Sequence, residues 1–271
     1  MASSKKVILI TGASSGVGQM TARLLSEKGF KVFGSSRKPA GADTVSGVEM
    51  LPLDVRSDDS VAVCVNAVIN VAGRIDILVN NAAYELAGAL EETSIDEAKA
   101  QFETNFFGVV RMVKAVLPSM RQQKQGQIIN VSSLSGVSSI PFMGVYSASK
   151  FALEGYTEAL RLEVSPLNIQ VSLTEAGFLK TPMMNKRQVS TAQLKEYDLW
   201  RQRAFNAIRD HEQKAPGPEL VAQTILSIIA SKAPRLRYVI GSQAKFATRL
   251  QWFLPEGAYE RGKRSTFRLD K

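Results

Sequence analysis

The chain has 271 residues, of which 45% are hydrophobic and 22% are charged, a composition typical of a globular protein. It excludes a disordered chain, which needs fewer apolar residues, and a membrane-spanning one, because the longest unbroken apolar run, residues 61–65, is too short. One cysteine (Cys64) excludes an internal disulfide, and one histidine (His211) excludes a multi-histidine metal site, so we expect no bound metal. No signal peptide precedes the first apolar run, so we expect a cytoplasmic protein.

The net charge of +9 is concentrated at the carboxyl-terminal end. Residues 232–271 hold ten of the 34 basic residues but only three of the 25 acidic ones, so the rest of the chain is nearly balanced. A balanced body argues against nucleic-acid binding. The basic extension, residues 241–271, is consistent with contact to an acidic membrane surface and equally with a solvated end that aids solubility.

Short apolar runs alternate with amphipathic segments along the chain. Strands are predicted at residues 5–11, 31–36, 48–53, 76–80, 127–132, 169–174 and 237–240. Helices are predicted at residues 17–28, 57–72 (capped by Ser57), 96–122 (bent at Pro118), 146–164 and 218–230. This alternation predicts one α/β domain over residues 1–271, a doubly wound parallel sheet (Rossmann fold) of about seven strands with helices on both faces. Residues 179–216 interrupt the alternation and are predicted to form a mobile insertion or lid.

A glycine-rich turn, TGASSGVG at residues 11–18, connects the first strand to the first helix. Gly12, Gly16 and Gly18 allow the backbone to turn sharply and approach a pyrophosphate, for which the helix start supplies N–H groups. A plain strand-to-helix turn also uses glycine. The position at the carboxyl end of the first strand nevertheless favours a nucleotide site.

The end of the second strand distinguishes the two nicotinamide dinucleotides. A carboxylate there would accept the ribose 2′-hydroxyl of NAD, but this chain has Ser36 and Arg37 instead. A guanidinium binds a 2′-phosphate with two charge-assisted hydrogen bonds, so we expect NADP(H) to be preferred over NAD(H). Asp54, at the end of the third strand, is consistent with an acceptor for the adenine amino group and equally with a cap of the following turn.

Further polar residues follow the fourth and fifth strands and open the next helix. Asn81 ends the fourth strand, Ser133 follows the fifth, and YSASK occupies residues 146–150. Tyr146 and Lys150 are four residues apart and share one face of a helix. Because an ammonium beside a phenol favours the phenolate, we expect Lys150 to lower the pKa of Tyr146 from ~10 and make it a general acid/base.

These motifs together, TGASSGVG, NNAA, NVSS and YSASK, resemble those of the short-chain dehydrogenase/reductase family, over roughly residues 5–240. The resemblance implies that Tyr146 is the catalytic acid/base, that Lys150 binds the nicotinamide ribose, that Ser133 holds the substrate oxygen, and that Asn105 anchors a water in a proton relay. It implies the cofactor-binding residues Gly12, Ser14, Ser15, Gly16, Val17, Gly18, Ser36, Arg37, Asp54, Val55, Asn81, Ala82, Tyr146, Lys150, Gly177 and Thr181. The implied substrate-binding residues are Ser133, Met143, Tyr146 and Phe178.

Two positions depart from the family pattern. Ala83 replaces the last glycine of NNAG, and residues 175–177 read Glu-Ala-Gly where the family has Pro-Gly. We expect Ala83 to be tolerated, whereas the missing proline loosens the turn that carries the nicotinamide.

The implied reaction is hydride transfer between a nicotinamide and a carbonyl or alcohol carbon. Apolar residues expected at the mouth of the site suit a lipophilic substrate, such as a steroid, retinoid or long-chain acyl ketone, although such residues also pack into cores. They are Leu134, Val137, Ile140, Phe142, Met143, Phe178, Leu179, Met183, Met184, Leu199, Trp200 and Phe205.

The tail resembles that of the 17β-hydroxysteroid and retinol dehydrogenase-like branch. Phe246, Leu250 and Phe253 are spaced by four and three residues, an apolar stripe that we expect to cover the substrate entrance rather than touch membrane or cap the core. The family commonly pairs its long helices between subunits, so a homo-oligomer, dimer or tetramer, is also expected.

Two other functions remain as alternatives: an NADP-binding redox sensor without turnover, and a membrane-surface protein that works through its basic tail. A serine hydrolase is disfavoured because Ser133 is not within G-x-S-x-G. His211, in a polar run, is expected to be a solvated loop residue, and Cys64 to be a core residue.

Overall fold

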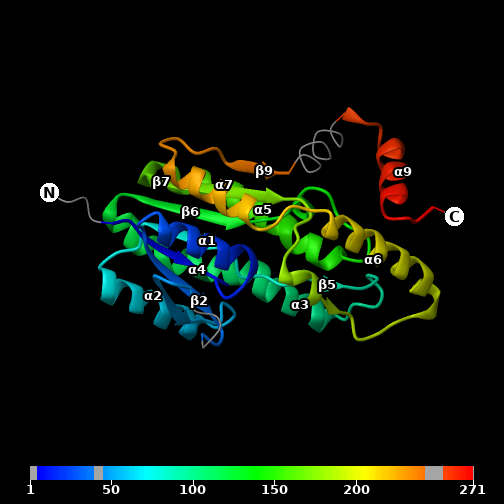
Figure 1. Cartoon of the computed structure of the whole chain (residues 1–271), viewed down its shortest axis with the longest axis horizontal. Helices are drawn as coiled ribbons and strands as arrows, with labels where there is room; N and C mark the ends of the chain where they lie inside the picture. Colours follow the sequence, from blue (N-terminus) through cyan, green and yellow to red (C-terminus); the bar gives the residue numbers. More distant parts are fainter. Residues whose placement is uncertain (1–4, 40–44, 242–252, 271) are drawn as a thin grey trace.

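A seven-stranded parallel sheet forms the centre of the computed structural model, which describes residues 5–39, 45–241 and 253–270 (Figure 1). Its strands are β1 (Val7–Ile10), β2 (Lys31–Ser36), β3 (Val48–Pro52), β4 (Ile77–Asn80), β6 (Gly126–Val131), β7 (Ile169–Ala176) and β9 (Arg237–Ile240). The strand order is β3-β2-β1-β4-β6-β7-β9, so the direction of winding reverses between β1 and β4. The predicted doubly wound sheet is confirmed, and ligands bind such sheets at the reversal point.

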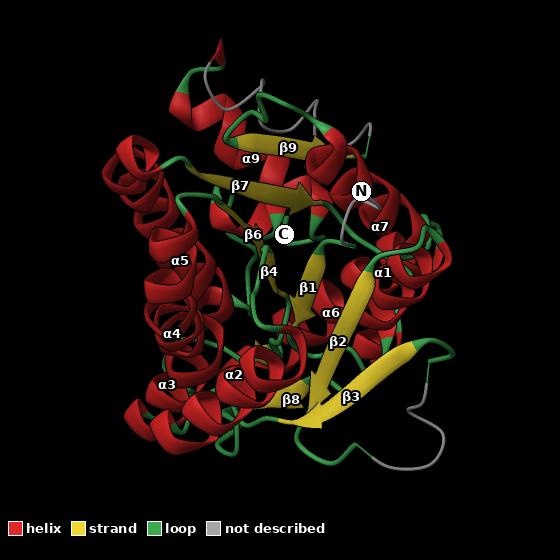
Figure 2. Cartoon of the chain, turned by 90° about the vertical axis from the view of Figure 1, so that its left-hand side faces the viewer, coloured by secondary structure: helices red, strands yellow, loops and turns green. Residues whose placement is uncertain are grey.

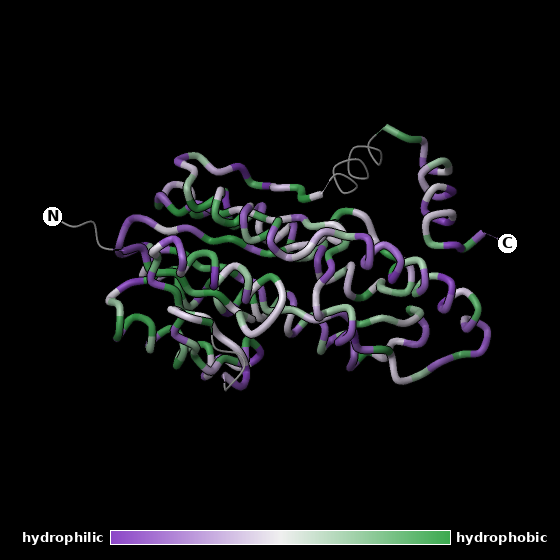
Figure 3. The backbone as a smooth tube through the Cα atoms, in the orientation of Figure 1, coloured by the Kyte–Doolittle hydropathy of each residue, from purple (hydrophilic) through white to green (hydrophobic). Residues whose placement is uncertain are grey.

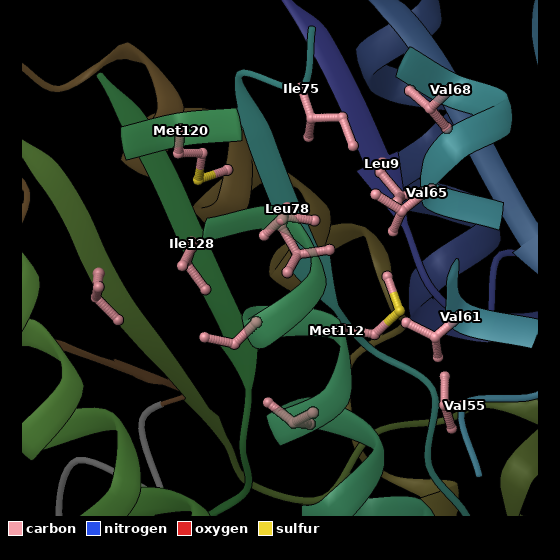
Figure 4. Close-up of a cluster of buried hydrophobic side chains, with 14 of the residues drawn as sticks. Leu9, Val55, Val61, Val65, Val68, Ile75, Leu78, Met112, Met120 and Ile128 are labelled. Atoms are coloured by element: carbon pink, nitrogen blue, oxygen red, sulfur yellow. The ribbon is translucent and has the colours of Figure 1, made fainter. Parts of the chain in front are cut away.

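Helices cover both faces of the sheet (Figure 2). One face carries α2 (Asp58–Ala72), α4 (Gly108–Gln123) and α5 (Gly144–Val164), and the other carries α1 (Gly16–Glu27) and α7 (Glu219–Ala230). Buried apolar side chains of α2 and α4 meet those of β1, β4 and β6 in a cluster, part of which is shown in Figure 4. Cys64 belongs to this cluster and is buried, as expected. Figure 3 shows hydrophobic stretches along central strands and also along the helices that pack on them.

The helix α2 begins and ends where the sequence indicates. The Ser57 hydroxyl accepts a hydrogen bond from the Ser60 backbone N–H at 3.2 Å, which satisfies one free donor of the first turn. Gly73 ends the helix with φ +74°, a conformation that costs glycine little. The predicted cap at Ser57 is confirmed.

The long helix predicted at residues 96–122 is divided in a different place from the one expected. It consists of α3 (Ile95–Phe102), a π-helical turn η2 (Glu103–Phe107) and α4. Pro118 lies inside α4, so the change in hydrogen bonding falls at η2 rather than at the proline. π-Helical turns are frequent at functional sites, and the side chain at the centre of this one is Asn105.

The insertion, residues 179–216, contains regular structure that the sequence did not predict. It comprises η5 (Pro182–Asn185), β8 (Gln188–Val189), η6 (Lys195–Tyr197) and α6 (Asp198–Gln213). β8 pairs in parallel with β5 (Leu86–Ala87), which follows β4, so the insertion docks beside the carboxyl ends of the central strands. A Glu97 carboxylate oxygen also accepts hydrogen bonds from the Thr191 backbone N–H and hydroxyl, at 2.8 and 2.9 Å.

The described part of the tail forms α9 (Glu256–Thr266), which packs against the loop after β6. The hydroxyls of Tyr259 and Ser138 lie 2.6 Å apart, and Phe267 is buried in a cluster with Met143, Tyr146 and Ile208. Phe253 is 85% exposed. Phe246 and Leu250 lie outside the described residues, so the apolar stripe and its covering role stay a prediction. Within the described ranges, no helix has both the length and the hydropathy needed to cross a membrane.

Candidate active site

A cleft of about 520 Å³ lies at the carboxyl ends of the central strands, where the winding reverses. One of its walls is formed by the glycine-rich turn, another by the turns after β4 and β6, and a third by the insertion. The structure brings nearly all predicted site residues to this cleft. Those that line it are Gly12, Ser14, Ser15, Gly16, Val17, Ser36, Arg37, Asp54, Val55, Asn81, Ala82, Ser133, Met143, Tyr146, Lys150, Gly177, Phe178 and Thr181. Gly18 and Asn105 lie behind the lining.

Asn81 holds the glycine-rich turn against the turn after β4. Its amide nitrogen donates to the backbone oxygens of Thr11 and Gly12, both at 3.0 Å, and the Thr11 hydroxyl accepts from the N–H groups of Asn81 and Ala82. A Cβ on Gly12 would lie 2.9 Å from the Ala82 Cα, and one on Gly18 would lie closer than 3.0 Å to the Gly12 oxygen. The two glycines therefore permit an approach of backbones that no larger residue allows.

The end of the cleft near β2 carries a hydroxyl and a guanidinium. The Ser36 hydroxyl is buried without a hydrogen-bond partner in the described structure, and the neighbouring Arg37 side chain is exposed. The side chain of Ser15 makes no cap bond at the start of α1, which leaves first-turn N–H groups free for an anion. These features fit the nicotinamide dinucleotide implied by the sequence.

The Asp54 carboxylate caps the turn that follows it and is paired with Arg56. Its Oδ1 accepts a hydrogen bond from the Arg56 backbone N–H at 3.0 Å, and its Oδ2 lies 2.6 Å from Arg56 Nη2. These contacts hold the pKa of the Asp54 carboxyl at about 2. The cap predicted for Asp54 is present, and because Asp54 also lines the cleft, its role as an acceptor for adenine stays a prediction.

Ser133, Tyr146 and Lys150 converge on the floor of the cleft. Ser133 follows β6 and opens the short helix η3 (Leu134–Gly136), and α5 presents Tyr146 and Lys150 on one face, as the spacing predicted. Lys150 is 4% exposed and donates a hydrogen bond from Nζ to the Val131 oxygen at 2.9 Å. Its Nζ lies 5.9 Å from the centroid of the Tyr146 ring.

The expected lowering of the Tyr146 pKa by Lys150 is wrong for this protein. Burial of the phenol raises its pKa above the usual value, and the charges of Glu85 and Glu212 raise it further. A hydrogen bond with Ser133 and the Arg187 charge oppose this rise. Burial also lowers the pKa of Lys150 to about 8. The ammonium is directed at a backbone oxygen rather than at the phenol, so loss of hydration decides the pKa of Tyr146.

Asn105 supports the cleft from behind. Its Oδ1 accepts from the Tyr84 N–H at 3.1 Å, and its Nδ2 donates to the Tyr84 oxygen at 3.0 Å and to the Ser149 hydroxyl at 3.3 Å. The π-helical turn thereby fixes the segment between β4 and β5. The predicted role of Asn105 in holding a water stays a prediction.

The substrate side of the cleft has an apolar lining. The predicted residues that form it are Leu134, Ile140, Met143, Phe178, Leu179, Met183 and Met184. The others do not line the cleft: Phe142 and Phe205 pack edge-to-face on each other, for example, and Leu199 is 53% exposed. His211 is not the expected loop residue, because it lies in α6, half-buried, and its ring stacks on Phe178 at 5.2 Å.

The sequence did not reveal one group of charged residues in this cleft. Arg187, from the insertion, places Nη2 2.7 Å from Glu85 Oε2 and 2.5 Å from Glu212 Oε1. Glu85 follows β4 and Glu212 belongs to α6, so the three residues meet only in the folded chain. We call Glu85, Arg187 and Glu212 the cleft triad.

The two departures from the family motifs are accommodated. Ala83 lines the cleft, and β7 continues through Glu175 and Ala176, which pair with Val239 and Ile240 of β9. The Gly177 N–H then donates to the Ile240 oxygen at 3.3 Å. Pairing along the strand thus holds the segment for which we expected a loosened turn.

Comparisons with known proteins identify the family of the chain. A family model described as short chain dehydrogenase matches residues 6–191. The 3-ketodihydrosphingosine reductase of Bacteroides thetaiotaomicron is 45% identical over 255 residues, covering 93% of this chain and 94% of that protein. Retinol dehydrogenase 8 of Bos taurus is 38% identical over 257 residues, covering 88% and 82%.

Among solved structures, a short-chain dehydrogenase/reductase from Burkholderia phymatum in complex with NAD superimposes with a TM-score of 0.81 at 27% identity, covering 92% of this chain and 93% of that one. The resemblance stated from the motifs is confirmed. The chain belongs to the short-chain dehydrogenase/reductase family and is an oxidoreductase acting on a carbonyl or alcohol carbon.

Proposed function

We propose that this protein uses NADP(H) in preference to NAD(H) to interconvert a lipophilic ketone and its alcohol, with reduction as the main direction. The convergence of Ser133, Tyr146 and Lys150 in one cleft with the glycine-rich turn carries this proposal. Gly12 to Gly18 and Asn81 would hold the pyrophosphate and adenosine side, and Lys150 the nicotinamide ribose. Gly177 and Thr181 would flank the nicotinamide.

The bound cofactor supplies the hydride, and the chain's own residues control the oxygen of the substrate. The hydroxyls of Ser133 and Tyr146 hydrogen-bond the carbonyl oxygen, which polarises the carbonyl bond as negative charge develops. Tyr146 then gives its proton to that oxygen. Because burial raises the pKa of Tyr146, the phenol carries its proton at neutral pH, and a protonated phenol is the form that reduction consumes.

The preference for NADP(H) is supported by the cationic end of the cleft. Arg37 is exposed there, the Ser36 hydroxyl has no partner in the described structure, and Asp54 is neutralised by Arg56. We expect Arg37→Asp to weaken NADPH binding at least about tenfold and to leave NADH binding unchanged or tighter. Lys38→Gln is the control for loss of one nearby exposed charge. Equal losses for both cofactors would contradict the proposed preference.

A lipophilic substrate is supported by the apolar lining of the cleft that holds Tyr146. This lining includes Met143, which precedes α5, and Phe178, which follows β7. The relative named 3-ketodihydrosphingosine reductase makes this long-chain ketone the first substrate to assay. The other compounds to assay are steroid and retinoid carbonyls and small sugars. The rate of NADPH consumption measures the turnover of each compound. Turnover confined to sugars would overturn the lipophilic assignment, and cofactor binding without turnover of any ketone would favour a redox sensor.

We also propose a cytoplasmic homo-oligomer in which the insertion forms a lid. Phe107 of η2 and Phe151 and Leu162 of α5 are large apolar side chains with 46%, 45% and 71% exposure, which a second subunit would cover. Analytical ultracentrifugation tests the oligomeric state, and a monomer at micromolar concentration would contradict the proposed oligomer.

Membrane contact by the basic tail is tested separately. Sedimentation with anionic liposomes is compared for the chain with and without residues 242–271.

A further inference from the structure

The cleft triad is a largely buried charged group beside the apolar lining of the cleft, to which the exposed Lys186 also belongs. The side chains of Glu85, Arg187 and Glu212 are 15%, 13% and 7% exposed. Arg187 donates through Nε to Glu85 Oε2 at 2.8 Å and through Nη2 to Glu212 Oε1 at 2.5 Å. Two carboxylates thus share one guanidinium, and the triad carries a net negative charge.

Each carboxylate has one oxygen that does not contact Arg187. Only Oε2 of Glu85 and Oε1 of Glu212 contact Arg187, and the second oxygen of each has no hydrogen-bond partner among the residues that the structure describes. Both residues line the cleft. Neither of these oxygens is among the buried atoms that lack a partner in the described structure, so both are accessible from the cleft, where a donor on a bound molecule can reach them.

The triad lies within electrostatic reach of the reacting phenol. The Glu85 carboxylate raises the pKa values of both Tyr146 and Lys150. Glu85 directly follows Tyr84, the residue whose backbone Asn105 fixes, so its position relative to the cleft floor is held by η2. The negative charge therefore lies at the end of the cleft where the carbonyl would react.

An anionic substrate group does not suit this place. Nε and Nη2 of Arg187 are already engaged, and an anion approaching the guanidinium would meet two carboxylates. The Lys150 ammonium is also engaged, because it donates to the Val131 oxygen at the end of β6. A cationic donor, in contrast, would hydrogen-bond the carboxylate oxygens that do not contact Arg187 and would balance the charge of the triad.

We propose that Glu85 and Glu212 bind an ammonium group on the carbon next to the reacting ketone, so that the substrate is a lipophilic α-aminoketone. This inference rests on the proposed ketone reduction and adds the group that selects the substrate. The aliphatic chain then lies along Phe178, Leu179 and Met183, and the ammonium and carbonyl lie at the polar end. 3-Ketodihydrosphingosine, with its amino group beside the ketone, belongs to this class.

The experiment compares ketones of one chain length that differ only next to the carbonyl: a primary amine, its N-acetyl derivative, the nitrogen-free ketone and a carboxylate. We expect kcat/KM for the amine to exceed that for the nitrogen-free ketone by about 10- to 100-fold, the value of one charge-assisted hydrogen bond. Glu85→Gln should reduce this ratio about tenfold or more, mainly through KM. Glu97→Gln, which removes a carboxylate holding the insertion outside the cleft, should keep the ratio.

Each outcome separates the inference from the proposed function. Turnover of no ketone overturns ketone reduction itself. Equal kcat/KM for the amine and the nitrogen-free ketone leaves reduction in place and overturns the ammonium site, and a preference for the carboxylate assigns the cleft triad to anion binding through Arg187. Inhibition of the unmodified protein by a long-chain primary amine, compared with the matching alcohol, needs no variant. An equal inhibition constant for both also overturns the site.

Discussion

Glu175 is a buried carboxylate whose ionised form lowers the free energy of unfolding. Its replacement by glutamine should therefore make the protein more stable. Its side chain is 2% exposed in β7, and its Oε1 has no hydrogen-bond partner in the described structure. The nearest cation is Arg237 of β9, with Nε 3.3 Å from Glu175 Oε1. The same Nε donates to Glu154 Oε2 of α5 at 3.2 Å, so two buried carboxylates compete for one guanidinium.

The magnitude follows from the pKa of Glu175, which burial and the Glu154 charge raise from 4.5 to about 7 while Arg237 opposes the rise. One pKa unit corresponds to about 1.4 kcal/mol, so the ionised native state is destabilised by about 3 kcal/mol. A carboxyl whose folded pKa is raised contributes stability that is fully present below pH 4.5 and is lost as the pH rises through about 7. Glu175→Gln, which cannot ionise, should therefore gain stability over the unmodified protein mainly between these values.

Urea unfolding followed by tryptophan fluorescence at pH 5, 6.5 and 8 measures this difference. We expect Glu175→Gln to be more stable by about 2–3 kcal/mol at pH 8 and to differ by about 1 kcal/mol or less at pH 5. Glu158→Gln removes the 56%-exposed partner of the same Arg237 and should change stability by less than about 1 kcal/mol at either pH. A pH-independent difference, or a less stable Glu175→Gln at pH 8, would refute the reasoning.

Three further predictions concern the cleft. Tyr146→Phe should reduce turnover by at least about a hundredfold while NADPH still binds by fluorescence titration, and near-normal rates would remove Tyr146 as proton donor. Gly18→Ala places a methyl against the Gly12 oxygen and should weaken NADPH binding about tenfold or more, whereas Gly262→Ala, in α9 with open space around it, should not. The kcat/KM for NADPH reports the free enzyme and should fall above pH about 8 as Lys150 loses its proton; a profile that stays flat to pH 9.5 would contradict the role of that ammonium.

The sheet and its flanking helices could be predicted because each element carries a local signal. The buried strands β1 and β4 are short apolar runs, and α2 is bracketed by Ser57 and Gly73. The π-helical turn around Asn105 has no such signal, since any helical sequence accommodates an extra residue when tertiary contacts stabilise it. Proline at position 118 was the visible irregularity, and it fits within α4 without ending it.

The same distinction applies to the residues of the candidate site. Motif residues such as Gly12 and Ser133 could be assigned because backbone approach and a reactive hydroxyl demand particular residue types at fixed positions. The cleft triad could not, because Glu85 and Arg187 are 102 positions apart and are joined through the pairing of two-residue strands. Short polar segments with charged side chains are common in loops, so nothing in the sequence distinguishes this pair from solvated residues.

Burial raises the pKa of Tyr146, an effect that the spacing of the residues alone did not predict. Spacing placed Lys150 one turn from Tyr146 and suggested a phenol made acidic by its neighbour. In the folded protein the phenol has lost its hydration, the ammonium is held by the Val131 oxygen, and the Glu85 carboxylate further disfavours phenolate. Tyr146 therefore retains its proton at neutral pH, and the protonated phenol is the form that the proposed ketone reduction consumes. Alcohol oxidation must begin by removing that proton against the Glu85 charge, so its rate should depend more steeply on pH than the rate of reduction.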